Sequence, residues 1–121
     1  MNPAAVVRSL SGDRAFQRLR KGNTGNGKHV TVRWRPTRQG EVRVGIVVSR
    51  KVGKAVVRNR VRRRLREAVR ELTRQPLRDA VYESSLPSFD LLVIARPSAA
   101  SANYAELKRS LSTAFERAKL L

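Results

Sequence analysis

Residues 49–75 read SRKVGKAVVRNRVRRRLREAVRELTRQ, and this stretch decides the fold. At 100° per residue its apolar side chains fall on one face of a helix. Gly53 lies just before this helix and Pro76 just after it, as expected for helix boundaries. The apolar face consists of Val57, Val61, Leu65, Ala68, Val69 and Leu72. The stretch therefore predicts one long helix that packs on the rest of the domain.

The other faces of this helix are crowded with arginine. In the row Arg58, Arg62, Arg66 and Arg70, like charges stand four residues apart, which costs a few tenths of a kcal/mol per pair. A phosphate backbone against this row would reverse the sign of that energy. Guanidinium groups also bind phosphate through paired hydrogen bonds and stack on unpaired bases. We interpret the helix as a nucleic-acid surface; the alternative is a solvated helix with an accidental basic face.

Composition supports the same interpretation. The 121 residues include 27 Lys and Arg against 9 Asp and Glu, a formal net charge of +18. Such a surplus repels itself and is tolerated when the usual partner is a polyanion. A basic tail or a membrane-surface helix would be the alternatives.

The same composition excludes several classes of protein. No apolar run approaches the roughly 20 residues of a membrane span, and no secretory signal is visible. Without cysteine, disulfides and thiolate metal sites are excluded. We expect a single cytoplasmic, nucleic-acid-binding domain over residues 1–121, with flexible ends at 1–8 and 120–121.

Shorter elements precede the long helix. Residues 11–21 predict a short helix, and the Gly/Asn-rich segment 22–27 predicts a loop. Apolar and polar residues then alternate from 29 to 35 and from 42 to 48, the pattern of half-buried strands. Because they follow each other across a short turn, we expect these two strands to pair as an antiparallel hairpin.

Beyond the long helix, residues 76–89 lack periodicity and are expected to be mostly loop, with one turn of helix around Arg78 to Tyr82 as the alternative. The continuous apolar run 91–95 predicts a strand buried on both faces. Asn103 and Glu106 have the spacing of a capping box that opens a last helix through about Lys119. The order helix, strand, strand, helix, strand, helix predicts an α/β (α+β) fold with helices packed on a small mixed sheet.

The stretch from Gly45 to Arg63, GIVVSRKVGKAVVRNRVRR, resembles the signature of the bacterial ribonuclease P protein subunit family. The shared pattern is an Arg-Asn-Arg helix behind a turn of Ser, a basic residue, Lys, an aliphatic residue and Gly. FQR at 16–18 and DLLVIAR at 90–96 agree as well, so the resemblance covers roughly residues 9–119. It implies a four-stranded mixed sheet packed with three helices. It also implies a left-handed strand-helix-strand crossover, although such crossovers are generally right-handed.

The resemblance also implies a function. The chain would bind a catalytic RNA and the single-stranded 5′ leader of precursor tRNA, and promote endonucleolytic removal of that leader. The implied RNA-binding positions are Ser49, Arg50, Lys51, Lys54, Arg58, Asn59, Arg60, Arg62, Arg63 and Arg66. The implied leader-binding cleft consists of Phe16, Arg20 and Arg33. Arg20 stands where many members carry a second aromatic residue, and Arg64 replaces a usually apolar residue.

Residues suited to catalysis by the protein itself are scarce. A protein nuclease needs convergent carboxylates or a histidine acid and base. His29 is the sole histidine and is interpreted as structural or solvated, and Asp79 and Glu83 lack a third partner. The remaining candidates, Asp13, Glu41 and Asp90, are interpreted as cap or turn residues. We predict no catalytic and no metal-ligating residue; the resemblance implies that the RNA subunit performs the chemistry with magnesium ions held mainly by RNA.

Two other classes remain open from the residues alone. A structural RNA-binding protein of the ribosomal type would also need a basic helix. A double-stranded DNA-binding protein could place the same helix in a major groove. Neither a membrane nor a small-molecule substrate is expected as a partner.

Overall fold

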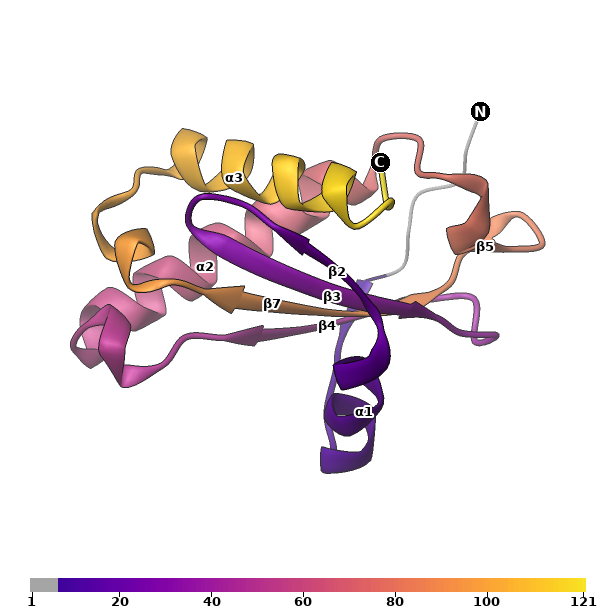
Figure 1. The fold of residues 1–121 in the computed structure, drawn as a ribbon, viewed down its shortest axis with the longest axis horizontal. Coiled ribbons are helices and arrows are strands. Elements are labelled where there is room, and N and C mark those ends of the chain that lie inside the picture. Colours follow the sequence, from indigo (N-terminus) through magenta and orange to yellow (C-terminus); the bar gives the residue numbers. More distant parts are fainter. Residues whose placement is uncertain (1–6) are drawn as a thin grey trace.

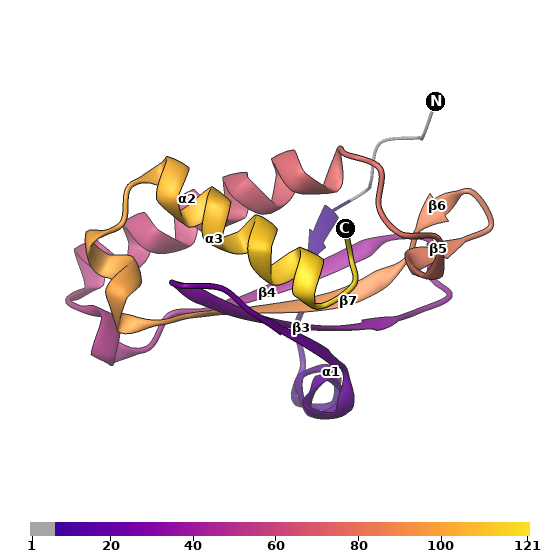
Figure 2. The same cartoon turned by 45° about the horizontal axis from the view of Figure 1, so that its top comes forward.

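The computed structural model describes residues 7–121, and Figure 1 shows a five-stranded sheet with helices on both faces. The strands of this sheet are β1 (Val7–Ser9), β2 (Asn23–Asn26), β3 (Val30–Pro36), β4 (Val42–Val47) and β7 (Phe89–Ala95). The helices are α1 (Asp13–Arg18), α2 (Ala55–Thr73) and α3 (Tyr104–Arg117). Figure 2 shows α2 and α3 covering one face and α1 crossing the other. The predicted α+β class with three helices is confirmed, with five strands in place of four.

The strand order β1-β4-β7-β3-β2 corrects the expected hairpin. β3 and β4 do not pair with each other, because β7 lies between them, antiparallel to β3 and parallel to β4. β7 is apolar on both faces, so burial favours the central position for it. β4, α2 and β7 form the strand-helix-strand crossover, whose handedness stays a prediction.

The Gly/Asn-rich segment is also a strand rather than a loop. β2 pairs antiparallel with β3 and runs beside α3. At Gly25 a Cβ atom would lie 2.1 Å from the carbonyl oxygen of Ala114, so only glycine lets the two backbones approach this closely. The glycine that suggested a loop therefore marks a close contact.

The expected flexible ends differ from the structure where it describes them. Residues 1–6 lie outside the described part, whereas Val7 and Arg8 form β1 and pair in parallel with β4. At the other end Leu120 is fully buried, and its carbonyl accepts a hydrogen bond of 2.9 Å from the backbone of Arg78. Leu120 therefore packs in the core, whereas the flexibility of residues 120–121 stays a prediction.

The main core fills the space between the sheet and the helix pair. The predicted apolar face of α2 packs there, fully buried except for the half-buried Val57. Trp34 donates its indole N–H to the Ala118 carbonyl at 2.7 Å and meets Phe89 edge-on, with ring centroids 6.0 Å apart. The aromatic pair fixes the C-terminal end of α3 on the sheet.

The helices that cover this core are joined and capped by polar contacts. The predicted capping box of α3 is confirmed. The Asn103 side-chain oxygen accepts a hydrogen bond of 2.8 Å from the Glu106 backbone N–H, and the Glu106 carboxylate accepts one of 3.0 Å from the Asn103 backbone N–H. Lys108 on α3 pairs with Glu71 on α2, and this hydrogen bond lowers the pKa of Glu71.

A second, smaller cluster lies on the opposite face of the sheet. Ala15 and Leu19 from α1 and the 3₁₀ helix that follows it (Leu19–Lys21) pack on Leu92, with Leu10 at the edge. Phe16 and Ile94 pack against this cluster and are partly buried. The predicted helix over 11–21 is therefore present from Asp13, and its apolar side holds it to the sheet.

Residues 76–89 contain more structure than expected. A 3₁₀ helix (Asp79–Val81) precedes a small hairpin of β5 (Tyr82–Glu83) and β6 (Leu86–Pro87). Ser84 turns this hairpin with φ of 57°. The two-residue strands are too short for a periodic pattern to reveal them.

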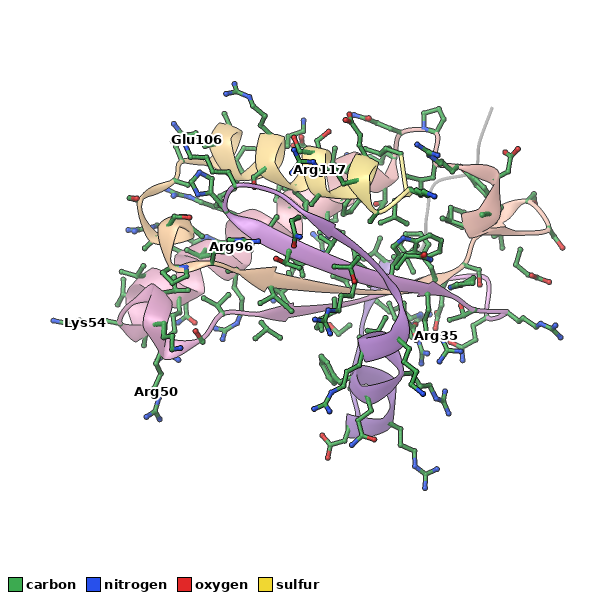
Figure 3. The ribbon with its side chains drawn as sticks, viewed as in Figure 1. Arg35, Arg50, Lys54, Arg96, Glu106 and Arg117 are labelled. Atoms are coloured by element: carbon green, nitrogen blue, oxygen red, sulfur yellow. The ribbon has the colours of Figure 1, made fainter. Side chains whose placement is uncertain are left out.

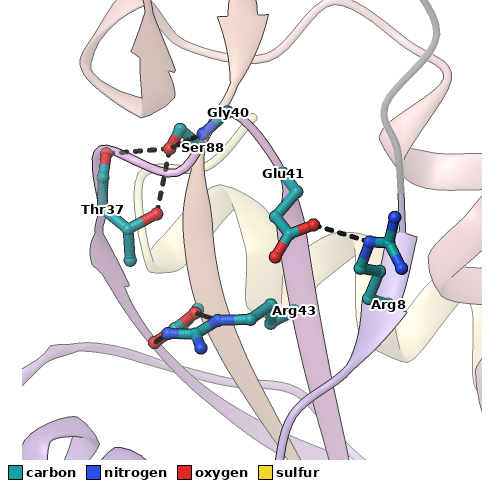
Figure 4. A network of polar contacts seen from close by, with 7 residues as sticks. Arg8, Thr37, Gly40, Glu41, Arg43 and Ser88 are labelled. Carbon is teal, nitrogen blue, oxygen red and sulfur yellow. Dashed lines mark hydrogen bonds and ion pairs between the residues drawn. The ribbon is translucent and has the colours of Figure 1, made fainter.

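Ion pairs and hydrogen bonds hold the turn between β3 and β4 (Figure 4). Arg43 binds both oxygens of Asp90, with Nε to Oδ1 and Nη2 to Oδ2 each 2.7 Å. Ser88 Oγ donates to the Thr37 carbonyl at 2.8 Å, and at the neighbouring edge Arg8 pairs with Glu41 at 2.7 Å. Glu41 is a turn residue, as expected, and it also pairs with Arg8. Asp90 instead lies within β7 and pairs with Arg43.

Asp90 and Glu41 provide a matched pair for a stability test. The Asp90 side chain is 3% exposed and that of Glu41 is 24% exposed, while their loss raises the net charge equally. We predict that Asp90→Asn lowers the free energy of unfolding by about 2–3 kcal/mol, because it strands a half-buried guanidinium. Glu41→Gln should cost less than about 1 kcal/mol. Urea unfolding of both variants checks this, and equal losses would contradict it.

Candidate nucleic-acid interface

The turn into α2 is built so that its basic side chains face solvent. Val52 is buried and anchors a 3₁₀ helix (Arg50–Val52), and Gly53 follows with φ of 153°. A Cβ atom at Gly53 would lie 3.2 Å from the Val57 side chain, so this position requires glycine. The predicted RNA-binding residues of this turn are all exposed, and they are Ser49, Arg50, Lys51 and Lys54.

The arginine row of α2 faces the sheet edge. Arg62, Arg66 and Arg70 line a cavity of about 230 Å³ together with Phe16 and β1. Asn59 accepts a hydrogen bond of 3.1 Å from the Arg62 guanidinium, which restricts where that group can point. The Asn of the Arg-Asn-Arg motif therefore positions an arginine that lines the cavity.

A second row of arginines on α2 has a different role. Arg60 donates to the Ala100 carbonyl at 3.2 Å, and Arg64 donates to the Ala102 carbonyl at 3.0 Å. Both bonds join α2 to the 3₁₀ helix Pro97–Ser101 and the residue after it. Arg64 can replace an apolar residue because its charged end reaches a backbone carbonyl. Arg63, between them, is exposed.

Two of the predicted RNA-binding arginines and one arginine of the predicted cleft carry an unsatisfied donor. The Nε atoms of Arg33, Arg58 and Arg60 are buried and have no hydrogen-bond partner among the described residues. Burying a donor without an acceptor costs roughly 1–3 kcal/mol. An acceptor supplied by a bound phosphate or base would remove this cost, which favours a polyanionic ligand at these positions.

The three predicted cleft residues come together in one cavity. Phe16 and Arg20 from the α1 segment and Arg33 from β3 line a space of about 310 Å³. Leu92, which pairs with Arg33 in the sheet register, also lines it and gives it an apolar wall. The cavity thus combines one half-buried aromatic ring, an apolar surface and two cations with one carboxylate, Asp13, so its lining carries a net positive charge.

Gly45 determines the position of the Phe16 ring. A Cβ atom at Gly45 would lie 2.9 Å from Cε1 of Phe16, closer than side chains approach, so the ring occupies the space that this glycine leaves. Phe16 lines the Arg20 and Arg33 cavity and also the cavity of the α2 arginines. The ring therefore connects the predicted cleft to the arginine row.

The predicted residues do not all converge. Phe16, Arg62 and Arg66 line shared cavities, whereas the turn of residues 49–54 lies at the N-terminal end of α2, away from α1 (Figures 1 and 3). Figure 3 shows Arg50 and Lys54 projecting outward there. The interface is an extended surface rather than a single pocket.

Arg70 belongs to the row identified by its four-residue spacing but was not among the implied RNA-binding positions, and it lines the cavity with Arg62 and Arg66. Sequence reasoning missed two other residues that line these cavities, Leu92 and Gly45. Leu92 could have been found because a strand buried on both faces presents alternate residues to α1. No sequence signal identified Gly45 as the support of the Phe16 ring, since that contact depends on the tertiary fold.

The interpretation of His29 as structural is confirmed. His29 is buried, its Nδ1 lies 2.8 Å from Ser98 Oγ, and its backbone N–H donates to Ser110 Oγ at 2.8 Å. Within residues 7–121, no three His, Asp or Glu side chains gather in a group that could hold a metal ion. No helix in this part of the chain combines the length and apolar composition needed to cross a bilayer.

Comparisons with known proteins agree with this geometry. The ribonuclease P protein component of Thermus thermophilus is 50% identical over 119 residues, which are 98% of this chain and 64% of that protein. That of Bacillus velezensis is 35% identical over 109 residues, 87% of this chain and 84% of that protein. The chain thus spans a little under two thirds of the length of the Thermus thermophilus relative.

Solved structures show the same fold. The RNase P protein of Staphylococcus aureus superposes with a TM-score of 0.75 at 26% identity, over 93% of this chain and 95% of that one. The RNase P protein of Thermotoga maritima gives a TM-score of 0.66 at 26% identity, over 87% and 92%. The family model for ribonuclease P matches residues 6–119. With nearly its whole length covered by that model, the chain belongs to the bacterial ribonuclease P protein family.

Proposed function

We propose that this chain acts as the protein component of the ribonuclease P ribonucleoprotein. It binds the catalytic RNA and the single-stranded 5′ leader of precursor tRNA, and so promotes cleavage that yields the mature 5′ end. The observation that carries the proposal is the cavity of Phe16, Arg20 and Arg33, which adjoins the arginine row of α2 through the Phe16 ring. Family membership supports the same assignment.

The Phe16 cavity suits an unpaired nucleotide. A base stacked on the Phe16 ring and packed against Leu92 gains about 1–3 kcal/mol, whichever base it is. Arg20 and Arg33 supply cations for the adjoining phosphates, and the unpartnered Nε–H of Arg33 offers a donor. Mature tRNA has no leader to place there, so the cavity favours the precursor.

The surface of α2 suits the catalytic RNA. Its arginines and the exposed turn of residues 49–54 form a broad basic surface, which binds phosphates without reading sequence. Neutralising the RNA there lowers the repulsion between RNA segments, so the complex needs less salt to fold. The contribution of the protein is therefore affinity and positioning.

We assign the chemistry to the RNA. The described residues gather no group of three His, Asp or Glu side chains that could hold a metal ion, which is consistent with this assignment. We propose that the magnesium ions are held mainly by RNA phosphates, that the protein chain requires no cofactor of its own, and that the complex works in the cytoplasm.

Reconstitution at low magnesium tests the proposal. Purified chain mixed with the cognate catalytic RNA should restore 5′ cleavage of precursor tRNA at a magnesium concentration where the RNA alone is inactive. Gel analysis of the 5′ product measures this. No stimulation across a full protein titration would refute the assignment, and co-purification with ribosomal subunits would favour the structural RNA-binding alternative.

Phe16→Ala tests leader stacking. We expect it to weaken binding of precursor tRNA to the reconstituted complex by about 1–2 kcal/mol, or roughly 5- to 30-fold, because the stacking surface is lost. Mature tRNA should bind as before. Phe16→Leu, which keeps an apolar side chain over Gly45, should show a similar loss and so separates stacking from packing. Equal weakening for precursor and mature tRNA would contradict the cleft.

Arg62→Ala tests the arginine row. The salt dependence of RNA binding should flatten by about 0.7 in log-log slope for each single-strand phosphate that the variant no longer neutralises. Arg64→Ala is a control on the same helix with the same change in charge, because Arg64 reaches the Ala102 carbonyl instead of the cavity. Equal slopes for Arg62→Ala and the wild type would show that Arg62 is merely solvated.

A further inference from the structure

A second basic cavity lies on the other flank of α1. Phe16 and Arg20 line the predicted cleft, whereas Arg14, Arg18 and Lys21 line a separate space of about 680 Å³. Helical spacing places these two groups on opposite sides of α1. The second cavity is more than twice as large as the cleft of about 310 Å³.

The cations of this second cavity are uncompensated. Among the described residues, no ion pair or side-chain hydrogen bond involves Arg14, Arg18, Lys21 or Arg35. An adjoining cavity of about 270 Å³ shares Arg18 and Arg35 and adds Arg38. The only acidic residue lining either space in the described chain is Asp90, and Arg43 already binds both of its oxygens. The surface is therefore built for an anion.

The two flanks of α1 are continuous. Gln17 lines both the Phe16 cleft and the second cavity. Arg33 lines the first and Arg35 the second, and both lie on the same face of β3, about 7 Å apart along the strand. Figure 3 shows Arg35 to the right of α1, on the side away from Arg50 and Lys54. A chain of phosphates that reaches Arg33 meets a further cation at Arg35.

The second cavity offers charge without a stacking surface. Its one aromatic residue, Trp34, is 3% exposed and packs in the core with its N–H bonded to Ala118. A base therefore has no ring to stack on, and the ligand must be recognised through its phosphates. Such binding is independent of sequence and sensitive to salt.

We propose that this second cavity binds the backbone phosphates of the leader beyond the nucleotides in the Phe16 cleft. The strand passes the exposed Gln17 and lies along Arg14, Arg18, Lys21 and Arg35. This inference rests on the proposed function, because it extends the same leader across α1. Its consequence is that affinity rises with leader length.

A leader-length series tests the inference. Precursor tRNAs with leaders of about 4 and about 12 nucleotides are bound to the reconstituted complex. For the wild type, the longer leader should bind more tightly. In the double variant Arg18→Ala/Arg35→Ala, the ratio of the affinity for the long leader to that for the short leader should be about 5- to 10-fold smaller than in the wild type. The log-log slope of long-leader affinity against salt concentration should flatten by about 1.4, because two phosphate contacts are lost. Binding of the short leader should be unchanged.

Arg74→Ala/Arg109→Ala is the matched control. It removes two exposed arginines, one at the C-terminal cap of α2 and one on α3, so the change in net charge is the same. It should keep the length dependence of the wild type. Thermal unfolding of both double variants verifies that each is folded.

Three outcomes would overturn the inference. An equal loss for short and long leaders in Arg18→Ala/Arg35→Ala would place the cavity against the catalytic RNA instead. Unchanged length dependence in this variant would show that the cations are only solvated. If the wild type binds precursor tRNA more tightly than mature tRNA but binds long and short leaders equally, only this inference is refuted. If the wild type does not prefer precursor tRNA at all, the proposed function is refuted as well.

Discussion

Burial of β7 on both faces is the constraint on which the rest of the structure depends. Phe89, Leu91 and Val93 face the core beneath α2 and α3, while Leu92 faces α1. A strand that is apolar on both sides must have protein on both sides. The central position of β7 therefore separates β3 from β4 and gives α1 a surface to pack on. The cleft with Phe16 exists because the second face of this strand is covered only in part.

The net charge of +18 is accommodated by keeping cations at the periphery. The row that includes Arg62 and Arg66 lines an open cavity, and Arg60 and Arg64 reach backbone carbonyls. Arg43 is instead neutralised within the protein, since its bidentate pair with the buried Asp90 raises the pKa of Arg43 and holds neighbouring strands together. The remaining positive charge lies on exposed surfaces that a polyanion can cover.

The elements were predictable where the pattern was long. The α2 helix, the β3 and β7 strands and the capping box at Asn103 followed from periodicity and spacing. Pairing was not predictable, because alternation shows that β3 and β4 each bury a face but not which strand lies between them. β2 was hidden because Gly25 is required by contact with Ala114, and a glycine required by tertiary contact looks the same in sequence as one in a loop.

The candidate site was predictable for a different reason. Phe16, Arg20 and Arg33 came from a family resemblance, and the fold brings them into one cavity. The contact of Phe16 with Gly45 and the basic flank with Arg18 depend on how α1 crosses the sheet, which no local pattern specifies.

The substitution of Arg20 for a second aromatic residue links the two flanks of α1. Among the described residues Phe16 is the one aromatic residue that lines the cleft, so under the proposed function stacking there would hold one base where two rings could hold more. Charge can supply the missing affinity, and the cations of α1 lie on both of its flanks. The α1 segment contacts the sheet chiefly through Ala15 and Leu19, which pack on Leu92. Because both cavities are lined by this one short segment, its position on the sheet determines the position of the cations in both. A chain that exchanges stacking for charge in this way should bind its RNA with a steeper dependence on salt than a relative with two rings.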